Sequence, residues 1–435
     1  MTTTWTNWSK LQRATPARVE TPWTTTELHR IVDEAVAQRR RIKAVGSGHS
    51  FTGIARADDI QLDLSNYTGI LDIDPSCQQV TVRTGTKLWD LAQLLTETGM
   101  AMENLGDINQ QSVAGAISTS THGTGVTFGG LASQVVGVEM LTGTGEILTV
   151  SEHHNAHLLD AVRVTLGALG IITNVTLQLV PEYDVHTVEA LTDLDMVLEH
   201  WDALNTANDH FEFFWFGHDT QVLAKTSQRL PVKHAVPSLG ASLRRTVLDD
   251  LITNSVLAGV CRIGRTNPAW VAPLNRLCTR LWGNSERTEH WSTGFTSRRR
   301  VRFNEMEYAL PYEAVPEVVA ELRQLFRREQ ISSTFPLEVR TAAPDTAWLA
   351  SNHGRKTGYI AVHQHFGQDY RQYFSQVEPI FLAAGGRPHW GKLHTLDCHQ
   401  LAPLYPHWDQ MVALRDKLDP DRIFSNPYLT QVLGA

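Results

Sequence analysis

The sequence has few cysteines and no close pair of them. Its four cysteines, Cys77, Cys261, Cys278 and Cys398, are widely spaced and form no C-x-x-C motif. That spacing disfavours a metal site or a redox-active pair and is typical of a protein in a reducing compartment. Long apolar runs are missing too, because no segment approaches the roughly 18 consecutive apolar residues of a membrane-spanning helix.

Basic residues are fewer than acidic residues. The 38 Lys and Arg residues are outnumbered by 46 Asp and Glu residues, which gives a formal net charge of −8. This balance disfavours nonspecific binding to nucleic acid or to an anionic membrane. The first residues, Met1 to Trp5, have neither the basic nor the apolar region of a signal peptide. We therefore expect a cytoplasmic protein with no nucleic-acid partner and no membrane span.

A glycine-rich loop follows the first clear strand signal. The apolar run 42–45 leads into the segment Gly46–Ser50, which contains two glycines and a histidine. Glycine lets the backbone approach a ligand closely, and successive N–H groups in such a turn form a concave site suited to a pyrophosphate. His49 would lie within covalent reach of a bound cofactor. The alternative is a tight turn with a surface histidine, because short glycine-rich motifs also match by chance.

Three more loops of small residues occur in the same half of the chain, at 104–116, 118–125 and 167–173. Together with the first loop they indicate one long ligand that passes several backbone turns. No dinucleotide fingerprint is present, because Phe51 stands where the third glycine would be. Its absence disfavours an NAD enzyme of the Rossmann type.

Hydrophobic periodicity predicts helices and strands that do not alternate as regular βαβ units, which favours an α+β fold. In the first half we expect helices at 24–40, with Thr26 as N-cap, and at 86–98, and strands at 60–64, 70–73, 80–83, 135–141, 147–150 and 171–180. In the second half we expect one sheet from strands 211–216, 302–309, 337–341 and 359–365, and helices at 314–328 and around Met411, Leu414 and Leu418. The stretch 228–284 carries no chemistry that its sequence identifies.

Two predicted strands of the second half carry ionisable residues on one face. Glu338 and Arg340 alternate with Leu337 and Val339, so a strand places both charges on the same side. His363 and His365 share a face in the same way. Glu338 and Arg340 are either a solvated ion pair or a pair that stabilises charge during a reaction. His363 and His365 are either structural histidines or candidates for a general base.

The segment Gly386–Leu393 is close to the phosphate-binding loop G-x-x-x-x-G-K-[ST] of nucleotide hydrolases. It departs from that motif because Leu393 replaces the hydroxyl that would hold magnesium and Pro388 removes a backbone N–H. A nucleotide-dependent phosphotransferase is therefore the weaker alternative, and Lys392 could also be a surface lysine. The three histidines within 153–157 have metal-like spacing but lie in a polar turn, where a solvated loop is expected.

These segments together resemble the vanillyl-alcohol-oxidase (VAO/PCMH) type of FAD-linked oxidoreductases. The shared elements are Gly-Ser-Gly-His-Ser at 46–50, Glu-Val-Arg at 338–340 and His-Trp-Gly-Lys at 389–392, and the resemblance covers nearly the whole chain. The last two elements are typical of the sugar-lactone (aldonolactone) branch, which includes the gulonolactone dehydrogenases of actinobacteria. The resemblance implies a two-domain α+β flavoprotein: residues 1–180 as the FAD-binding domain, 181–395 as a substrate (cap) domain with an antiparallel sheet flanked by helices, and 396–435 as a tail that returns to the FAD-binding domain.

The resemblance also implies the site residues. FAD would be bonded covalently to His49, and no metal is implied. The implied catalytic residues are Glu338, Arg340, Lys392, His363 and Ser112. The implied FAD-binding residues besides His49 are Val45, Gly46, Ser47, Gly48, Ser50, Gly106, Asp107, Ser112, Gly115, Ser118, Thr121, His122, Gly123, Gly125, Ile172 and Lys392.

The implied reaction is the oxidation of a sugar 1,4-lactone of the gulono-, galactono- or arabinono- type at the hydroxyl carbon next to the carbonyl. Glu338 would orient hydroxyls, while Arg340 and Lys392 would stabilise charge on the flavin that accepts the hydride. Two alternatives keep the flavin: an alditol oxidase of the xylitol or sorbitol type, and a flavin-bearing binding protein without turnover. The electron acceptor is oxygen or a redox carrier, and Gly106 would leave space near the flavin that permits slow turnover with oxygen.

Overall fold

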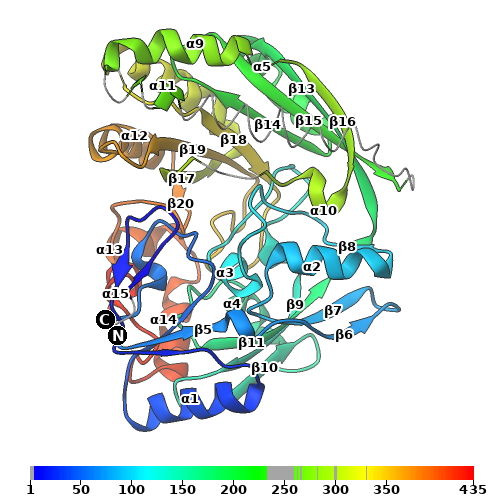
Figure 1. The fold of residues 1–435 in the computed structure, drawn as a ribbon, viewed down its shortest axis with the longest axis vertical. Helices are drawn as coiled ribbons and strands as arrows, with labels where there is room; N and C mark the ends of the chain where they lie inside the picture. Colours follow the sequence, from blue (N-terminus) through cyan, green and yellow to red (C-terminus); the bar gives the residue numbers. More distant parts are fainter. Residues whose placement is uncertain are drawn as a thin grey trace.

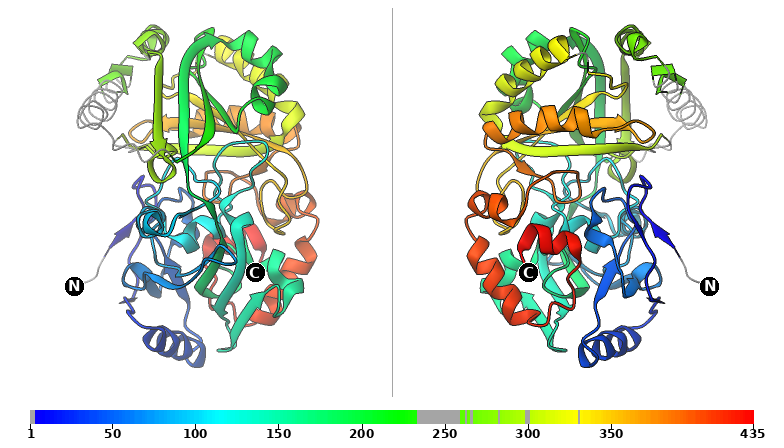
Figure 2. Two further views of the ribbon diagram at one scale, coloured as in Figure 1. Left: turned by 90° about the vertical axis from the view of Figure 1, so that its right-hand side faces the viewer. Right: turned by 90° about the vertical axis from the view of Figure 1, so that its left-hand side faces the viewer.

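Two antiparallel sheets dominate the fold and occupy opposite halves of the molecule (Figures 1 and 2). The computed structural model describes residues 4–232, 259–261, 263–264, 267–281, 283–297, 301–329 and 331–435. One sheet has five strands and the other has eight, and helices flank both. This mixture of helices with antiparallel sheets is the α+β architecture that the sequence predicts.

The first half is built on the five-stranded sheet and a smaller parallel one. In spatial order the five strands are β10 (Ile147–Ser151), β9 (Val135–Leu141), β11 (Ile171–Gln178), β7 (Gln79–Arg83) and β6 (Ile70–Asp74). The parallel sheet contains β3 (Arg18–Glu20), β5 (Ile60–Asp63) and β4 (Ile42–Val45). The strands lie close to their predicted positions, and the loop 46–50 begins where β4 ends. Short elements complete this half: β1 (Trp5–Thr6), β2 (Arg13–Ala14), α2 (Leu88–Leu95), α3 (Val113–Ser118) and α4 (Leu159–Val162).

Helix α1 (Thr25–Ala37) has its N-cap two residues before the predicted one. Thr24, not Thr26, is the N-cap: its hydroxyl accepts a hydrogen bond from the backbone N–H of Glu27, and the Glu27 side chain bonds back to the Thr24 N–H. This capping box needs an acid three residues after the cap, a condition that Thr24 meets and Thr26 does not. The predicted cap was therefore wrong, although the predicted helix is present and buries Leu28, Ile31, Val32 and Ala35.

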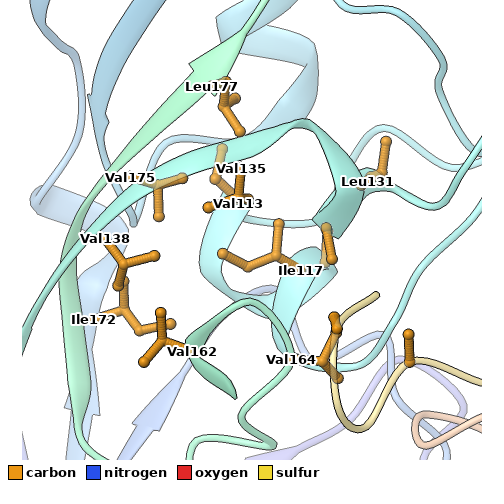
Figure 3. Packing of buried hydrophobic residues seen from close by; sticks show 14 of the residues in the cluster. Val113, Ile117, Leu131, Val135, Val138, Val162, Val164, Ile172, Val175 and Leu177 are labelled. Atoms are coloured by element: carbon orange, nitrogen blue, oxygen red, sulfur yellow. The ribbon is translucent and has the colours of Figure 1, made fainter. Parts of the chain in front are cut away.

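The core of the first half includes residues from the end of the chain. Val113 and Ile117 of α3 pack against β9 and β11 (Figure 3). The C-terminal helices α13 (Cys398–Leu401), α14 (Trp408–Leu418) and α15 (Pro427–Leu433) add Leu401, Met411 and Leu429 to the same cluster. The last forty residues are thus part of a core that is formed mainly by the first 180, with a few residues from the second half such as Leu349 and Trp390.

The second half is built on the eight-stranded sheet. In spatial order its strands are β16 (Ser285–His290), β13 (Tyr183–Asp193), β15 (Gln221–Pro231), β14 (His210–Trp215), β18 (Leu337–Ala342), β19 (Thr357–His365), β17 (Phe303–Pro311) and β20 (Arg387–Pro388). The chain enters this half after β12 (Val180–Pro181), which pairs with β8 (Met100–Ala101). The boundaries 1–180, 181–395 and 396–435 stay our proposal, which the sheet membership of the strands supports.

The two faces of the eight-stranded sheet differ in polarity. Its apolar face packs against α5 (Leu194–Glu199), α6 (Trp201–Thr206), α11 (Val315–Glu329) and α12 (Arg371–Ala383) through residues such as Phe213, Val339 and Ile360. The opposite face, which we call the charged face, carries Glu212, Lys225, Glu305, Glu307, Glu338, Arg340, Tyr359 and His363. Successive strand residues point to opposite sides, so this split follows directly from the alternation in the sequence. Two further helices, α9 (Val271–Leu281) and α10 (Trp291–Gly294), lie beside the sheet.

No helix among the described residues is long and apolar enough to cross a lipid bilayer.

The cap of α1 provides a test of the local fold. Substitution Thr24→Ala removes a side chain that satisfies an orphan N–H and is expected to lower the free energy of unfolding by about 1 kcal/mol. Thr26→Ala, at an exposed position inside the helix, is the matched control and is expected to change it by less than about 0.5 kcal/mol. Denaturant midpoints measured for both variants check this, and equal losses would contradict the assignment of the cap.

Candidate functional site

A cavity of about 910 Å³ runs through the first half of the molecule. All four small-residue loops contribute to its wall. The residues predicted to bind the cofactor that line it are Val45, Gly46, Ser47, Gly48, His49, Ser50, Ser112, Gly115, Ser118 and Ile172. Gly106, Asp107, Thr121, His122, Gly123, Gly125 and Lys392 are not among the lining residues. The cavity is thus long enough to pass four separate turns, as the sequence predicts for one extended ligand.

Position 46 requires a glycine because the Ser112 side chain approaches it closely, and not because of an unusual backbone angle. A Cβ at Gly46 would lie 2.4 Å from the hydroxyl oxygen of Ser112. That hydroxyl accepts a hydrogen bond from the N–H of Gly115 and caps α3, the short helix whose first turn faces the cavity. The contact therefore brings the loop 46–50 against the start of α3. Ser112 lies at this junction in the cavity wall.

His49 lies in the cavity wall against Trp8. Their ring centroids are 5.9 Å apart in a stacked arrangement, and the backbone N–H of Trp8 donates to the carbonyl of Gly48 at 2.8 Å. Burial, with the nearby charges of Lys392 and Lys87, lowers the pKa of His49 to about 4. The imidazole is therefore neutral near pH 7, the state in which a ring nitrogen has a free lone pair for bonding.

Lys43 is an unexpected cation at the same cavity. Its Nζ donates to the carbonyl oxygens of Leu166, Gly167 and Phe424, at 3.4, 3.1 and 3.2 Å. Burial, and then the charge of Arg415, lowers its pKa to about 7. Lys43 thus joins β4 to a cavity loop and to the C-terminal tail. A lysine inside the apolar run 42–45 was the sequence signal that could have revealed it.

The segment 389–392 connects the cavity to the charged face. The N–H of Phe51 donates to the carbonyl of Gly391 at 2.7 Å, so the loop that contains His49 holds this segment directly. Lys392 then reaches the sheet, where its Nζ lies 2.5 Å from Glu305 and 3.9 Å from Glu307. Burial alone would raise the pKa of Glu305, but Lys392 and His363 outweigh it and lower the pKa to about 2.

Arg340 is clamped between two buried carboxylates. Its guanidinium donates to Glu338 on its own strand and, through Nε at 2.9 Å, to Glu212 on β14. Glu212 also accepts from Lys225 at 2.7 Å. Burial opposes ionisation of Glu212, but Lys225 and Arg340 lower its pKa to about 2. Burial likewise opposes the charge on Arg340, yet Glu338 and Glu212 raise its pKa well above the usual range. The Glu338–Arg340 pair is therefore buried, and the solvated alternative does not hold.

The two histidines of β19 differ in their surroundings. His363 is buried, its Nδ1 lies 2.9 Å from the carbonyl of Pro336, and its Nε2 lies 3.5 Å from Glu305. His365 is partly exposed at the end of the strand. Only His363 is thus placed among the ionisable residues near Lys392.

The segment Gly386–Leu393 does not form a phosphate-binding loop. Such a loop joins a strand to a helix and binds phosphate. Here β20 pairs with β17, and Lys392 forms an ion pair with Glu305. The histidines within 153–157 are exposed in a turn, as expected of a solvated loop. Neither segment supports a nucleotide or metal chemistry.

Gly106 does not leave open space where a side chain would go. A Cβ at this position would lie 3.0 Å from the backbone carbonyl oxygen of His122 and 3.5 Å from the Thr121 side chain. An alanine would therefore push on the 118–125 loop before it could narrow the cavity. The expectation that Gly106 leaves space near a flavin that alanine would fill lacks support in this geometry.

Three acidic residues of the charged face were missed from the sequence. Glu305 and Glu307 alternate with Met306 and Tyr308, and Glu212 stands between Phe211 and Phe213. The period-two pattern was present in both strands, but neither strand matched a recognised motif. An acid in an apolar strand is a usable signal, because a buried carboxylate needs a partner.

Comparison with known proteins gives matches along the whole chain. Residues 16–151 match the model of an FAD binding domain, and residues 175–432 match that of D-arabinono-1,4-lactone oxidase. The chain is 40% identical to L-gulono-1,4-lactone dehydrogenase of Mycobacterium tuberculosis, over the full length of both, and 32% identical to L-gulonolactone oxidase of Bos taurus, over 98% of this chain and 97% of the relative. A solved cholesterol oxidase from Brevibacterium sterolicum has the same fold, with a TM-score of 0.82 at 15% identity over 100% of this chain and 97% of its own.

The clamp around Arg340 makes a measurable contribution to stability. Glu212→Gln leaves Lys225 and Arg340 buried with one carboxylate fewer and is expected to lower the free energy of unfolding by about 3 kcal/mol. Glu189→Gln is the matched control, because Glu189 lies on the same sheet but pairs with the more exposed Arg287 at 3.0 Å. Its loss is expected to stay below about 1 kcal/mol.

The same variant tests the pH dependence. The folded-state pKa of Glu212, about 2, lies below its unfolded value of about 4.3, so its contribution is complete above that value and is lost as the pH falls toward 2. Between about pH 5 and pH 2, the free energy of unfolding should therefore fall less steeply with decreasing pH for Glu212→Gln than for the unsubstituted protein. An unchanged slope would contradict the assigned ionisation.

Proposed function

The chain belongs to the D-arabinono-1,4-lactone oxidase family of FAD-linked oxidoreductases, and we propose that it oxidises a sugar 1,4-lactone with FAD as its cofactor. The observation that carries the proposal is the junction at 389–392, where one short segment touches both the cavity loop and the charged face. That junction supports a redox cofactor site beside fixed cations and carboxylates, an arrangement suited to a polyhydroxylated substrate. The relatives named for gulono- and arabinono-lactones support this substrate class.

The residues of the cavity fit FAD in shape and chemistry. The cavity passes four backbone turns, and its wall is formed largely by glycine, serine and aliphatic residues, which suits a long ligand with an anionic centre. The loop 46–50 and the start of α3 would hold the pyrophosphate, and Ile172 would contact the rest of the cofactor. When bound, FAD supplies the two-electron chemistry by accepting a hydride from the substrate carbon.

The charged face supplies orientation and electrostatics for the substrate. Glu338 accepts hydrogen bonds from substrate hydroxyls, while Arg340 and Lys392 favour negative charge at the reacting centre. His363, with Nδ1 tied to a backbone carbonyl, is the proposed base that takes the hydroxyl proton. Ser112 lies in the cavity wall and is proposed as a contact on the cofactor side of the substrate.

An open-chain alditol is the alternative substrate on the same fold, but the named relatives do not favour it. An anaerobic screen of flavin bleaching with sugar lactones and alditols tests the proposal. Bleaching by 1,4-lactones supports it, and bleaching by alditols alone would contradict it. Reoxidation of the reduced protein with air or with an artificial acceptor then distinguishes oxygen from a redox carrier. We also propose that the protein acts in the cytoplasm without nucleic acid, in line with its four free cysteines and negative charge.

We further propose that FAD is bonded covalently to His49. The support is its neutral imidazole in the wall of the cavity. Acid precipitation of the purified protein should leave yellow colour in the pellet, and His49→Ala should release it to the supernatant. His153→Ala, at an exposed histidine, is the control and should leave the colour in the pellet. Free flavin in the supernatant of the unsubstituted protein would refute the linkage.

Arg340→Ala is expected to slow anaerobic flavin reduction about a hundredfold, because one fixed charge at a reacting centre contributes on the order of 3 kcal/mol. Flavin content should change little, since Arg340 lies on the sheet and not in the cavity wall. Arg287→Ala, on the distant edge strand β16, is the matched control and should reduce at the normal rate. Stopped-flow traces within about threefold of each other for the two variants would exclude the assigned role.

A further inference from the structure

The start of the chain forms a short hairpin that lies against the cavity. Strands β1 and β2 pair antiparallel, with Trp5 opposite Ala14, and residues 7–12 form the turn between them. We call residues 5–14 the N-terminal strap. The match to the FAD binding domain begins at residue 16, so the strap lies outside the matched residues. It has no part in the function proposed above.

The strap is hydrogen-bonded to the glycine-rich loop at two points. The backbone N–H of Trp8 donates to the carbonyl of Gly48 at 2.8 Å. The side-chain amide of Asn7 donates to the carbonyl of Ser50 at 3.0 Å. These two carbonyls belong to the residues directly before and after His49. The strap therefore fixes the backbone on both sides of this histidine.

Asn7 is the residue on which this attachment depends. Its side chain is buried, and its Oδ1 accepts a hydrogen bond from the N–H of Gln12 at 2.9 Å. That bond sets the orientation of the amide, so Nδ2 is the atom that faces the Ser50 carbonyl. Gln12 itself donates to the carbonyl of Phe51 at 3.2 Å. An aspartate at position 7 could keep the bond to Gln12 but would place an acceptor against the Ser50 carbonyl.

Trp8 brings the strap into the cavity wall. Of residues 5–14, it is the one that lines the cavity. Its indole is half-buried and stacks on His49, with ring centroids 5.9 Å apart. The rings of Phe51 and of Phe303 on β17 meet it edge-on, with centroids 6.3 and 5.2 Å away. Three aromatic neighbours therefore hold the indole beside His49.

An indole held in a cavity wall is suited to contact a flat ring of a ligand. We propose that the N-terminal strap is part of the FAD site, in which Trp8 contacts the flavin end of the cofactor and Asn7 positions the loop around His49. Trp8 is assigned to the flavin end because it stacks on His49, the residue proposed to hold the flavin. This role rests on the proposed function for its cofactor, but not for its substrate.

The contact of Trp8 is tested by binding in the His49→Ala background, in which the cofactor can be removed and added back. Trp8→Ala and Trp8→Leu should each raise the dissociation constant for FAD at least about tenfold, because neither keeps a ring. Trp8→Phe should raise it less than about threefold. The constant for ADP, which lacks the flavin, should change less than about threefold in all three variants. Trp23→Ala, at an indole that is 64% exposed, is the control and should change neither constant.

Asn7→Asp should have a different effect, because it disturbs the loop and not the indole. It should raise the dissociation constants for FAD and for ADP alike, each at least about tenfold. Asn208→Asp is the matched control and should change neither constant. Asn208 also donates to a carbonyl, that of Leu204 at 2.8 Å, and accepts from Gln228 at 3.1 Å, but it does not line the cavity.

Three results would overturn the proposal. A constant for FAD within about threefold of the His49→Ala parent in both Trp8→Ala and Trp8→Leu would refute the contact. Equal weakening of FAD and ADP by these variants would refute its place at the flavin end, and unchanged constants in Asn7→Asp would refute the positioning role. If no lactone reduces the flavin of the unsubstituted protein, the proposed function fails, while these constants still decide the role of the strap.

Discussion

The eight-stranded sheet must keep charged side chains on a face that water hardly reaches. A buried charge is tolerated only beside an opposite one, so each carboxylate on this face holds a cation: Glu212 holds Lys225 and Arg340, and Glu305 holds Lys392. The pairing fixes positions as well as charges, because a residue with two partners cannot move without abandoning one of them. Cations that are already held in this way would need no rearrangement during the reaction that we propose for this face.

The same constraint explains why two halves with separate cores act as one enzyme. The cavity lies in the first half and the cations lie on the sheet of the second, and the segment 389–392 is hydrogen-bonded to one and ion-paired to the other. A second contact between the halves comes from loop 118–125 of the first half, where His122 lies against Glu307 of the second. Two crossing contacts of this kind fix the orientation of the sheet over the cavity more firmly than either would alone.

Much of the fold could be predicted from the sequence because its patterns are local. Alternation placed Glu338 and Arg340 on one strand face, and small residues marked the four loops that line the cavity. What could not be predicted depends on distant partners. Glu212 has no local feature that points to Arg340, more than a hundred residues away, and nothing near Gly106 shows that the His122 carbonyl occupies the space beside it. The N-cap is a local feature that the sequence does contain, because Glu27 stands three residues after Thr24 and not after the predicted cap Thr26.

The C-terminal tail has a consequence for how the protein is made. Lys43 bonds to the carbonyl of Phe424, and the Tyr428 hydroxyl bonds to the carbonyl of Trp390, two residues before Lys392. Both bonds need residues that leave the ribosome long after the cavity loops. A nascent chain therefore cannot complete either end of the site until Phe424 and Tyr428 have emerged. We therefore expect the cavity to take its final shape only after the tail that contains Phe424 and Tyr428 has packed against it.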